Sequence, residues 1–133
     1  MVCSGLPSDP YYYTCQESFA APPVIIKFYG YGKPLYKDNV AIVLSRAIGE
    51  TTIHLPQISI QRHVHSYVSG NVALIIHTKR LLNWGMLREV EKGIWNFVNE
   101  YEFVDFDFDL GAPTLWKERI YGTGALTHRA SNP

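Results

Sequence analysis

The chain has 133 residues and a formal net charge of zero, with 47% hydrophobic and 18% charged residues. This length and composition fit one globular domain and exclude a largely disordered chain. The balanced charge, without a cluster of lysine and arginine, argues against tight binding to nucleic acids, and no apolar run approaches the ~20 residues that cross a membrane.

The first 23 residues are predicted to form an irregular tail, and residues 24–133 a single α+β domain. The tail carries four of the eight prolines and shows no hydrophobic periodicity. Both cysteines of the chain, Cys3 and Cys15, lie in this tail. Two thiols in a terminal tail are typical of a disulfide in a secreted protein. We therefore expect a Cys3–Cys15 bond and secretion, with a cytoplasmic location as the alternative.

The residues after the tail predict a strand followed by a helix. In the strand, residues 24–29, side chains alternate between the core and a face that carries Lys27 and Tyr29. In the helix, apolar residues recur at i, i+3, i+4, i+7 and i+8 from Val40 to Ile48. Gly49 is expected to end this helix as a left-handed cap.

Residues 52–80 are predicted to form strands, with a hairpin turn at Ser69-Gly70-Asn71. A three-residue loop would place the apolar residues of both strands on one face, whereas a two-residue loop would mix valines with histidines on both faces. The sequence therefore favours the three-residue loop, in which His63 lies opposite His77. This register gathers four polar side chains on one face: His63, His65, Tyr67 and His77.

A second helix is predicted from the N-cap Asn83 to about Glu100. Its apolar residues form one stripe that consists of Leu87, Val90, Ile94, Val98 and Tyr101. Gly93 lies in the interior of this helix, where glycine costs about 1 kcal/mol relative to alanine. Close approach to a sheet is the usual compensation, so we expect the helix to pack against the sheet at Gly93.

Residues 103–110 show the clearest strand pattern in the chain, because apolar and acidic residues alternate. One face of this strand carries the carboxylates of Asp105, Asp107 and Asp109. The last segment, residues 116–126, is expected to add an edge strand. Its Gly122-Thr123-Gly124 run lacks the strand-and-helix context of a phosphate-binding loop and is predicted to be a glycine bend.

The order strand, helix, strand, strand, helix, strand is that of the ferredoxin-like, split βαβ fold. We therefore predict an α+β protein with a four- to five-stranded antiparallel sheet, in which the four strands of the motif have the spatial order 4-1-3-2. Both helices would cover one face of the sheet and leave the other face open.

The open face is expected to hold the functional residues. The predicted binding residues are Tyr29, Tyr67, Asp105 and Asp109, and the candidates for proton transfer are His63, His65, His77 and Asp107. His63 and His65 would lie about 7 Å apart on one strand, a spacing that permits a shared metal ion. No ligand motif accompanies them, so we expect neither a metal nor a cofactor. An ordinary solvated strand face would carry the same residue types.

Apolar side chains also fall on the open face, among them Ile25 and Ile75. A mixed patch of this kind is usually covered. The cover is expected to be either a second copy of the chain, packed sheet to sheet as a homodimer, or residues 1–23 folded across the face. A homodimer would enclose the histidines and aspartates and favour an enzyme.

One stretch of the chain carries a resemblance to known proteins. Leu82-Asn83-Trp84-Gly85-Met86-Leu87, continued by Val90 and Gly93-Ile94-Trp95, resembles the second helix of small fungal proteins, many of them secreted, without an assigned activity. The likeness extends to Gly70-Asn71-Val72-Ala73-Leu74 and to Gly122-Thr123-Gly124. It implies a ferredoxin-like architecture and a fungal source but assigns no functional residue. At the level of the fold, secreted fungal killer toxins and effectors with ferredoxin-like domains are similar.

Two functions are compatible with these patterns. The first is a small secreted interaction protein, effector-like or toxin-like, that binds a protein or another macromolecule through its open sheet face. The second is a cofactor-free enzyme of the dimeric α+β barrel type, such as a cyclase, isomerase or monooxygenase of secondary metabolism, acting on a small molecule. A closed pocket with His77 or Asp107 at its floor would favour the enzyme, and a flat solvated face would favour the binding protein.

Overall fold

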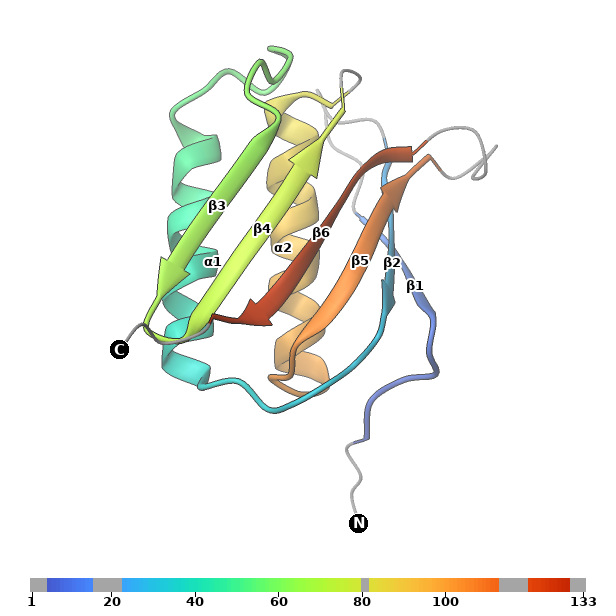
Figure 1. The fold of residues 1–133 in the computed structure, drawn as a ribbon. Helices are drawn as coiled ribbons and strands as arrows, with labels where there is room; N and C mark the ends of the chain where they lie inside the picture. The colour runs from blue at the N-terminus through green and yellow to red at the C-terminus, as the bar shows by residue number, and fades with distance from the viewer. Residues whose placement is uncertain (1–4, 16–22, 80–81, 113–119, 130–133) are drawn as a thin grey trace.

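The structure is a computed structural model that describes residues 5–15, 23–79, 82–112 and 120–129. These residues form a six-stranded antiparallel sheet with two helices packed on one of its faces (Figure 1). In chain order the elements are β1 (Tyr11–Thr14), β2 (Ile25–Tyr29), α1 (Lys37–Thr52), β3 (Val64–Ser69), β4 (Val72–Thr78), α2 (Trp84–Glu100), β5 (Phe106–Gly111) and β6 (Ile120–His128). Neither described helix has the length and apolar character needed to cross a membrane.

The α+β class and the placement of both helices on one face are confirmed, but the ferredoxin-like strand order is wrong. The observed order across the sheet is β1-β2-β5-β6-β4-β3, and all neighbouring strands are antiparallel. Among the four strands of the predicted motif, β2 and β5 have exchanged places, because their observed order is β2-β5-β4-β3. Two further strands also differ from the prediction. β1 comes from the tail that was expected to be irregular, and β6 lies between β5 and β4 instead of at an edge (Figure 1).

β6 fits in the centre of the sheet because glycine leaves room for the side chains and backbone around it. A Cβ atom at Gly124 would overlap the ring of Phe108 on β5 and would lie 2.6 Å from the Ile75 carbonyl oxygen on β4. The fully buried ring of Phe108 therefore packs against the bare backbone of β6. The run from Gly122 to Gly124 is accordingly part of a strand and not the predicted bend.

The second helix follows its prediction closely. The Asn83 side chain caps α2 by accepting a hydrogen bond from the Met86 backbone N–H at 2.8 Å. Gly93 allows the expected close approach to the sheet, since a Cβ atom there would lie 2.9 Å from the Tyr13 ring and 3.0 Å from the Ile26 side chain. Glycine at this position therefore lets α2 pack closely on β1 and β2.

The first helix is longer than predicted. α1 continues through Gly49 to Thr52, so Gly49 is not a C-terminal cap. At this end Thr51 is buried, and the Arg88 guanidinium of α2 donates a hydrogen bond to its carbonyl oxygen at 3.3 Å. A side chain from the neighbouring helix thus satisfies one of the terminal carbonyl groups of α1.

The core lies between the helices and one face of the sheet. Alternation along β5 is confirmed, because Phe106 and Phe108 are buried whereas Asp107 is exposed. The rings of Phe28 on β2 and Phe97 on α2 stack with their centroids 4.0 Å apart. Each large apolar side chain buried in this way contributes roughly 1.5–3 kcal/mol to folding, so the inner face of the sheet is fixed by packing.

The described part of the tail extends the sheet at its edge. Tyr13 of β1 points toward α2, where its hydroxyl accepts a hydrogen bond from Asn96 at 3.0 Å. Cys15, which follows β1, is a buried free thiol. The predicted disulfide is therefore not formed in the structure, and Cys3 lies outside the described residues. Residues 5–15 do not fold across the open face (Figure 1).

Candidate functional site

The hairpin of β3 and β4 turns through two residues, so the predicted three-residue register is wrong. Ser69 pairs with Val72, and His65 pairs with Ile76. Gly70 adopts a φ of +57°, and two-residue turns with a positive φ match the twist of paired strands. The two-residue turn therefore determines the register, although this register mixes apolar and polar side chains on each face of the hairpin.

This register divides the predicted histidine cluster between the two faces of the sheet. His65 and Tyr67 point toward the helices, and His65 is only 1% exposed. His77 is exposed on the other face, while His63 precedes β3 and has its Nδ1 3.2 Å from the Thr78 carbonyl oxygen. His63 and His65 therefore do not share a site. Within the described parts of the chain, no group of three or more His, Cys, Asp or Glu side chains could hold a metal ion.

The face opposite the helices, here called the outer face, keeps the remaining predicted residues together. No described element covers it (Figure 1). Strand pairing places its side chains in rows that cross the sheet. One row is Lys27, Asp109, Thr123 and His77, and the next is Tyr29, Asp107, Ala125 and Ile75.

A groove, here called the β6 groove, follows β6 on the outer face. It has a volume of about 420 Å³ and is lined by Tyr29, Ile75, His77, Asp107, Thr123, Gly124 and Ala125. The groove exists because β6 presents the small side chains of Thr123 and Ala125 between larger ones on β4, β5 and β2. This volume is within the range of ~300–1,000 Å³ typical of ligand sites.

Carboxylates dominate the electrostatics on the β5 side of the groove. The Tyr29 hydroxyl donates a hydrogen bond to Asp109 Oδ1 at 3.0 Å. Partial burial and then this hydrogen bond raise the pKa of Tyr29 to about 12, so the phenol stays a donor at neutral pH. The Lys27 ammonium lies 5.5 Å from the centroid of the Tyr29 ring and pairs with neither aspartate. Asp107 has no hydrogen-bond or ion-pair partner among the described residues.

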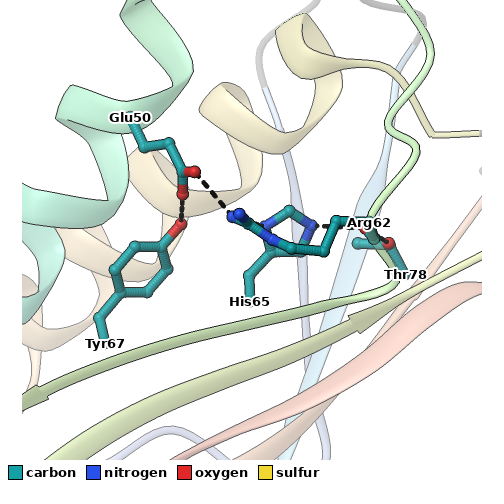
Figure 2. Close-up of polar contacts among 5 residues, drawn as sticks. All are labelled: Glu50, Arg62, His65, Tyr67 and Thr78. Carbon is teal, nitrogen blue, oxygen red and sulfur yellow. Dashed lines mark hydrogen bonds and ion pairs between the residues drawn. The ribbon is translucent and has the colours of Figure 1, made fainter.

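A second polar site, here called the inner cluster, lies on the helix side of the sheet and comprises Glu50, Arg62, His65, Tyr67 and Thr78 (Figure 2). The Glu50 carboxylate accepts a hydrogen bond from the Tyr67 hydroxyl and another, of 2.7 Å, from Arg62 Nη2. Arg62 Nη2 also lies 3.1 Å from His65 Nδ1, and His65 Nε2 lies 3.0 Å from the Arg62 carbonyl oxygen. Because arginine can only donate, Nδ1 accepts and Nε2 carries the proton.

The contacts in the inner cluster determine its protonation states. Burial and then the Arg62 guanidinium lower the pKa of His65, consistent with a neutral imidazole. Burial alone would raise the pKa of Glu50, but hydrogen bonds from Tyr67 and Arg62 lower it below the ordinary value. Burial and the hydrogen bond to Glu50 raise the pKa of Tyr67. Since these groups satisfy one another, the inner cluster ties α1 to β3 and offers a ligand little unused hydrogen-bonding capacity.

Glu91 of α2 lies close to this cluster and is completely buried. Neither of its carboxyl oxygens has a hydrogen-bond partner in the described structure. Burial and then the charge of Glu50 raise the pKa of Glu91 well above its ordinary value, so folding favours the protonated carboxyl group. A buried polar group without a partner costs stability, which makes Glu91 the least compensated residue of the core.

Other hollows lie outside the β6 groove, and two of them are larger than about 300 Å³. One, of about 310 Å³, is lined by Glu50, His54, Ile58, Ser59, Gln61, Arg62 and Trp84. The His54 ring already stacks on Trp84 there, with the centroids 3.7 Å apart. The other, of about 360 Å³, lies beside the helices and is lined by Ala41, Leu44, Ser45, Ile48, Gly49 and Trp95. Its lining contains no ionisable side chain, so it offers a partner no charge to pair with.

Sequence patterns did not single out Glu50, Arg62 or Glu91. The spacing of Glu91 indicates burial, because Glu91 lies four residues after Leu87 and three before Ile94, on the apolar stripe of the helix. Its burial could therefore have been predicted. The pairing of Glu50 with Arg62 joins a helix end to a loop and leaves no local pattern.

No known protein family, curated protein or solved structure matches this chain. A functional role therefore has to rest on the two sites themselves. The inner cluster is closed by its own hydrogen bonds, whereas the outer face combines an open groove with the Asp107 carboxylate, which has no partner among the residues that the structure describes. The outer face is the better candidate for a functional site.

Proposed function

We propose that this protein is a binding module that holds a macromolecular partner on its outer face, along the β6 groove. The observation that carries the proposal is the open groove itself, in which small residues of β6 lie between the side chains of Ile75 and His77 on one side and Tyr29 and Asp107 on the other. A surface that mixes apolar and polar groups in this way is typical of protein interfaces. The carboxylates beside the groove would repel nucleic acid phosphates.

The enzyme alternative depends on the predicted proton-transfer residues, but the structure does not bring these residues together at one place. His65 is buried beneath the sheet and His63 lies before β3, so only His77 and Asp107 flank the groove. They lie on strands separated by β6 and two residues out of register, about 12 Å apart at the backbone from standard strand spacings. Two side chains this far apart do not form an acid–base pair. Their separation supports a binding role over a catalytic one.

The resemblance to small secreted fungal proteins supports an effector-like or toxin-like role for the module. The buried free thiol of Cys15 removes the disulfide as an argument for secretion. Secretion therefore stands on the resemblance alone. A second copy of the chain is a poor partner for the outer face, because sheet-to-sheet packing would bring two sets of β5 aspartates toward each other near the middle of the sheet.

A peptide selection tests the proposal. A random displayed library is selected on immobilised full-length protein, and the enriched peptides are titrated against wild type, Ala125→Phe and Ile42→Phe. Ala125→Phe fills the β6 groove. Ile42→Phe adds the same ring to α1, where Ile42 is 41% exposed and away from the sheet.

We expect Ala125→Phe to weaken binding about tenfold or more, because the new ring occupies the site, while Ile42→Phe leaves affinity unchanged. Circular dichroism verifies that both variants are folded. Peptides that bind all three proteins equally would overturn the proposal, as would a library from which nothing is enriched.

A further inference from the structure

The charges around the β6 groove are not balanced within the described residues. The ion pairs among the described residues are Glu50 with Arg62, Glu89 with Lys92, and Asp105 with His128. None of them includes Asp107 or Asp109. Lys27 is the cross-strand neighbour of Asp109, yet its ammonium lies over the Tyr29 ring. Asp107 at the groove and Asp109 beside it are therefore left without an ion-pair partner among the described residues.

The backbone beside Asp107 leaves room for its carboxylate. Gly30, which follows β2, has a φ of +69°, and a Cβ atom there would lie 3.1 Å from Asp107 Oδ2. Glycine is suited to this position for two reasons, since it tolerates the positive φ and does not crowd the carboxylate. Asp107 is exposed, and its carboxylate faces solvent at the wall of the groove.

Apolar and aromatic groups complete the groove around these charges. Ala125 and Ile75 provide a surface that could pack against the methylene stem of a long cationic side chain. The Tyr29 ring, already in contact with one cation, offers a face suited to another delocalised cation. Asp107 can accept both hydrogen bonds of a planar guanidinium group, which an ammonium group cannot offer in the same geometry.

We infer, resting on the proposed binding function, that the partner is a peptide segment that places an arginine side chain in the β6 groove. Its guanidinium pairs with Asp107 next to Tyr29, and its stem lies over Ala125 and Ile75. Charge complementarity selects this occupant, because the groove is the part of the described outer face where negative charge is unmatched.

Titrations with defined probes test the inference. Full-length protein is titrated into a fluorescein-labelled peptide of alternating valine and arginine, and into the same peptide with citrulline in place of arginine. Citrulline keeps the shape of the side chain and removes the charge. The variants are Asp107→Asn, which removes the carboxylate charge, and Glu100→Gln, which removes one charge from the exposed end of α2 and serves as the control.

We expect the arginine peptide to bind at least about tenfold tighter than the citrulline peptide, with the difference shrinking at high salt. Asp107→Asn should weaken the arginine peptide about two- to fivefold, the range of exposed ion pairs, and leave the citrulline peptide unchanged. Glu100→Gln should change neither.

Equal affinity for the two peptides, or equal effects of Asp107→Asn on both, would overturn the inference. Its failure can be told apart from failure of the binding function. Selected peptides that lose affinity for Ala125→Phe but contain no basic residue would overturn the arginine inference and leave the binding function standing. Selected peptides indifferent to Ala125→Phe would remove both.

Discussion

Two glutamates near the inner cluster respond to pH in opposite directions. The pKa of Glu50 is lowered, so its contribution to stability is present above the ordinary value of 4.5 and is lost as the pH falls through its folded pKa. The pKa of Glu91 is raised, so stability is lost as the pH rises from 4.5 toward its folded pKa. Together these two groups favour a maximum in stability near their common ordinary pKa of 4.5.

Replacing Glu91 with leucine should therefore stabilise the protein. The change removes a buried carboxyl group without a partner, and the gain at pH 8 should be about 1–3 kcal/mol. The gain should be smaller at pH 5, just above the ordinary pKa of 4.5, where protonating the wild-type carboxyl group on folding costs less than at pH 8. Urea unfolding at both pH values measures this, with Glu100→Gln as the control. A leucine variant that is less stable at both values would show that Glu91 has a partner.

Cys15 should behave as a protected thiol. Burial and then the charge of Glu89 raise the pKa of Cys15 to about 12, so almost no reactive thiolate exists near neutral pH. In a Cys3→Ser variant, which isolates Cys15, labelling by a thiol reagent at pH 8 should follow global unfolding and accelerate sharply in urea. Rapid stoichiometric labelling of the folded variant would contradict the buried position.

At the scale of elements, β6 is the strand on which the sheet and the groove both depend. Its glycines permit the inner packing, and its small outward side chains form the groove floor. Gly124→Ala should cost about 1–3 kcal/mol or more, because the new Cβ atom would overlap the Phe108 ring and crowd the backbone of β4. Ala125→Ser, at the next position but on the outward side, is the control and should be nearly neutral. Denaturant midpoints compare the two, and equal stabilities would refute the packing role of Gly124.

The sequence predicted those elements whose pattern is local. The alternation of β5, the Asn83 cap and the tight packing at Gly93 each follow from a few adjacent residues, and all three are confirmed. The place of β6 was not predictable in this way. Its glycines gain their meaning from Phe108 on another strand, so no period within β6 indicates a central position.

The sequence predicted the part of the candidate site that depends on local strand alternation, but not the part that depends on the register between strands. Tyr29, Asp107 and His77 were placed on the outer face from strand alternation, and all three line the groove. His65 and Tyr67 were assigned to the wrong face, because polar grouping was weighted above the chemistry of the Gly70-Asn71 turn. A shift of one residue in register moves every side chain of a strand to the other face.

At the scale of the whole molecule, the two faces of the sheet differ in how they are covered and in whether their polar groups are paired. One face is sealed by α1, α2 and the aromatic core, and the polar groups beneath it are mostly paired with one another (Figure 1). The other face lacks a described cover, and no described lysine, arginine or histidine forms an ion pair with Asp107 or Asp109 there. This asymmetry is the basis of the claim that the outer face is where a partner binds.

Nuclear magnetic resonance tests this claim most directly. A selected peptide is titrated into ¹⁵N-labelled full-length protein, and amide shift changes are mapped on the structure. We expect the largest changes around the β6 groove, at Ile75, His77, Asp107, Thr123 and Ala125, with α1 and α2 unaffected. Changes that cluster around Trp95 and the hollow beside the helices, with the amides of β6 unmoved, would contradict it.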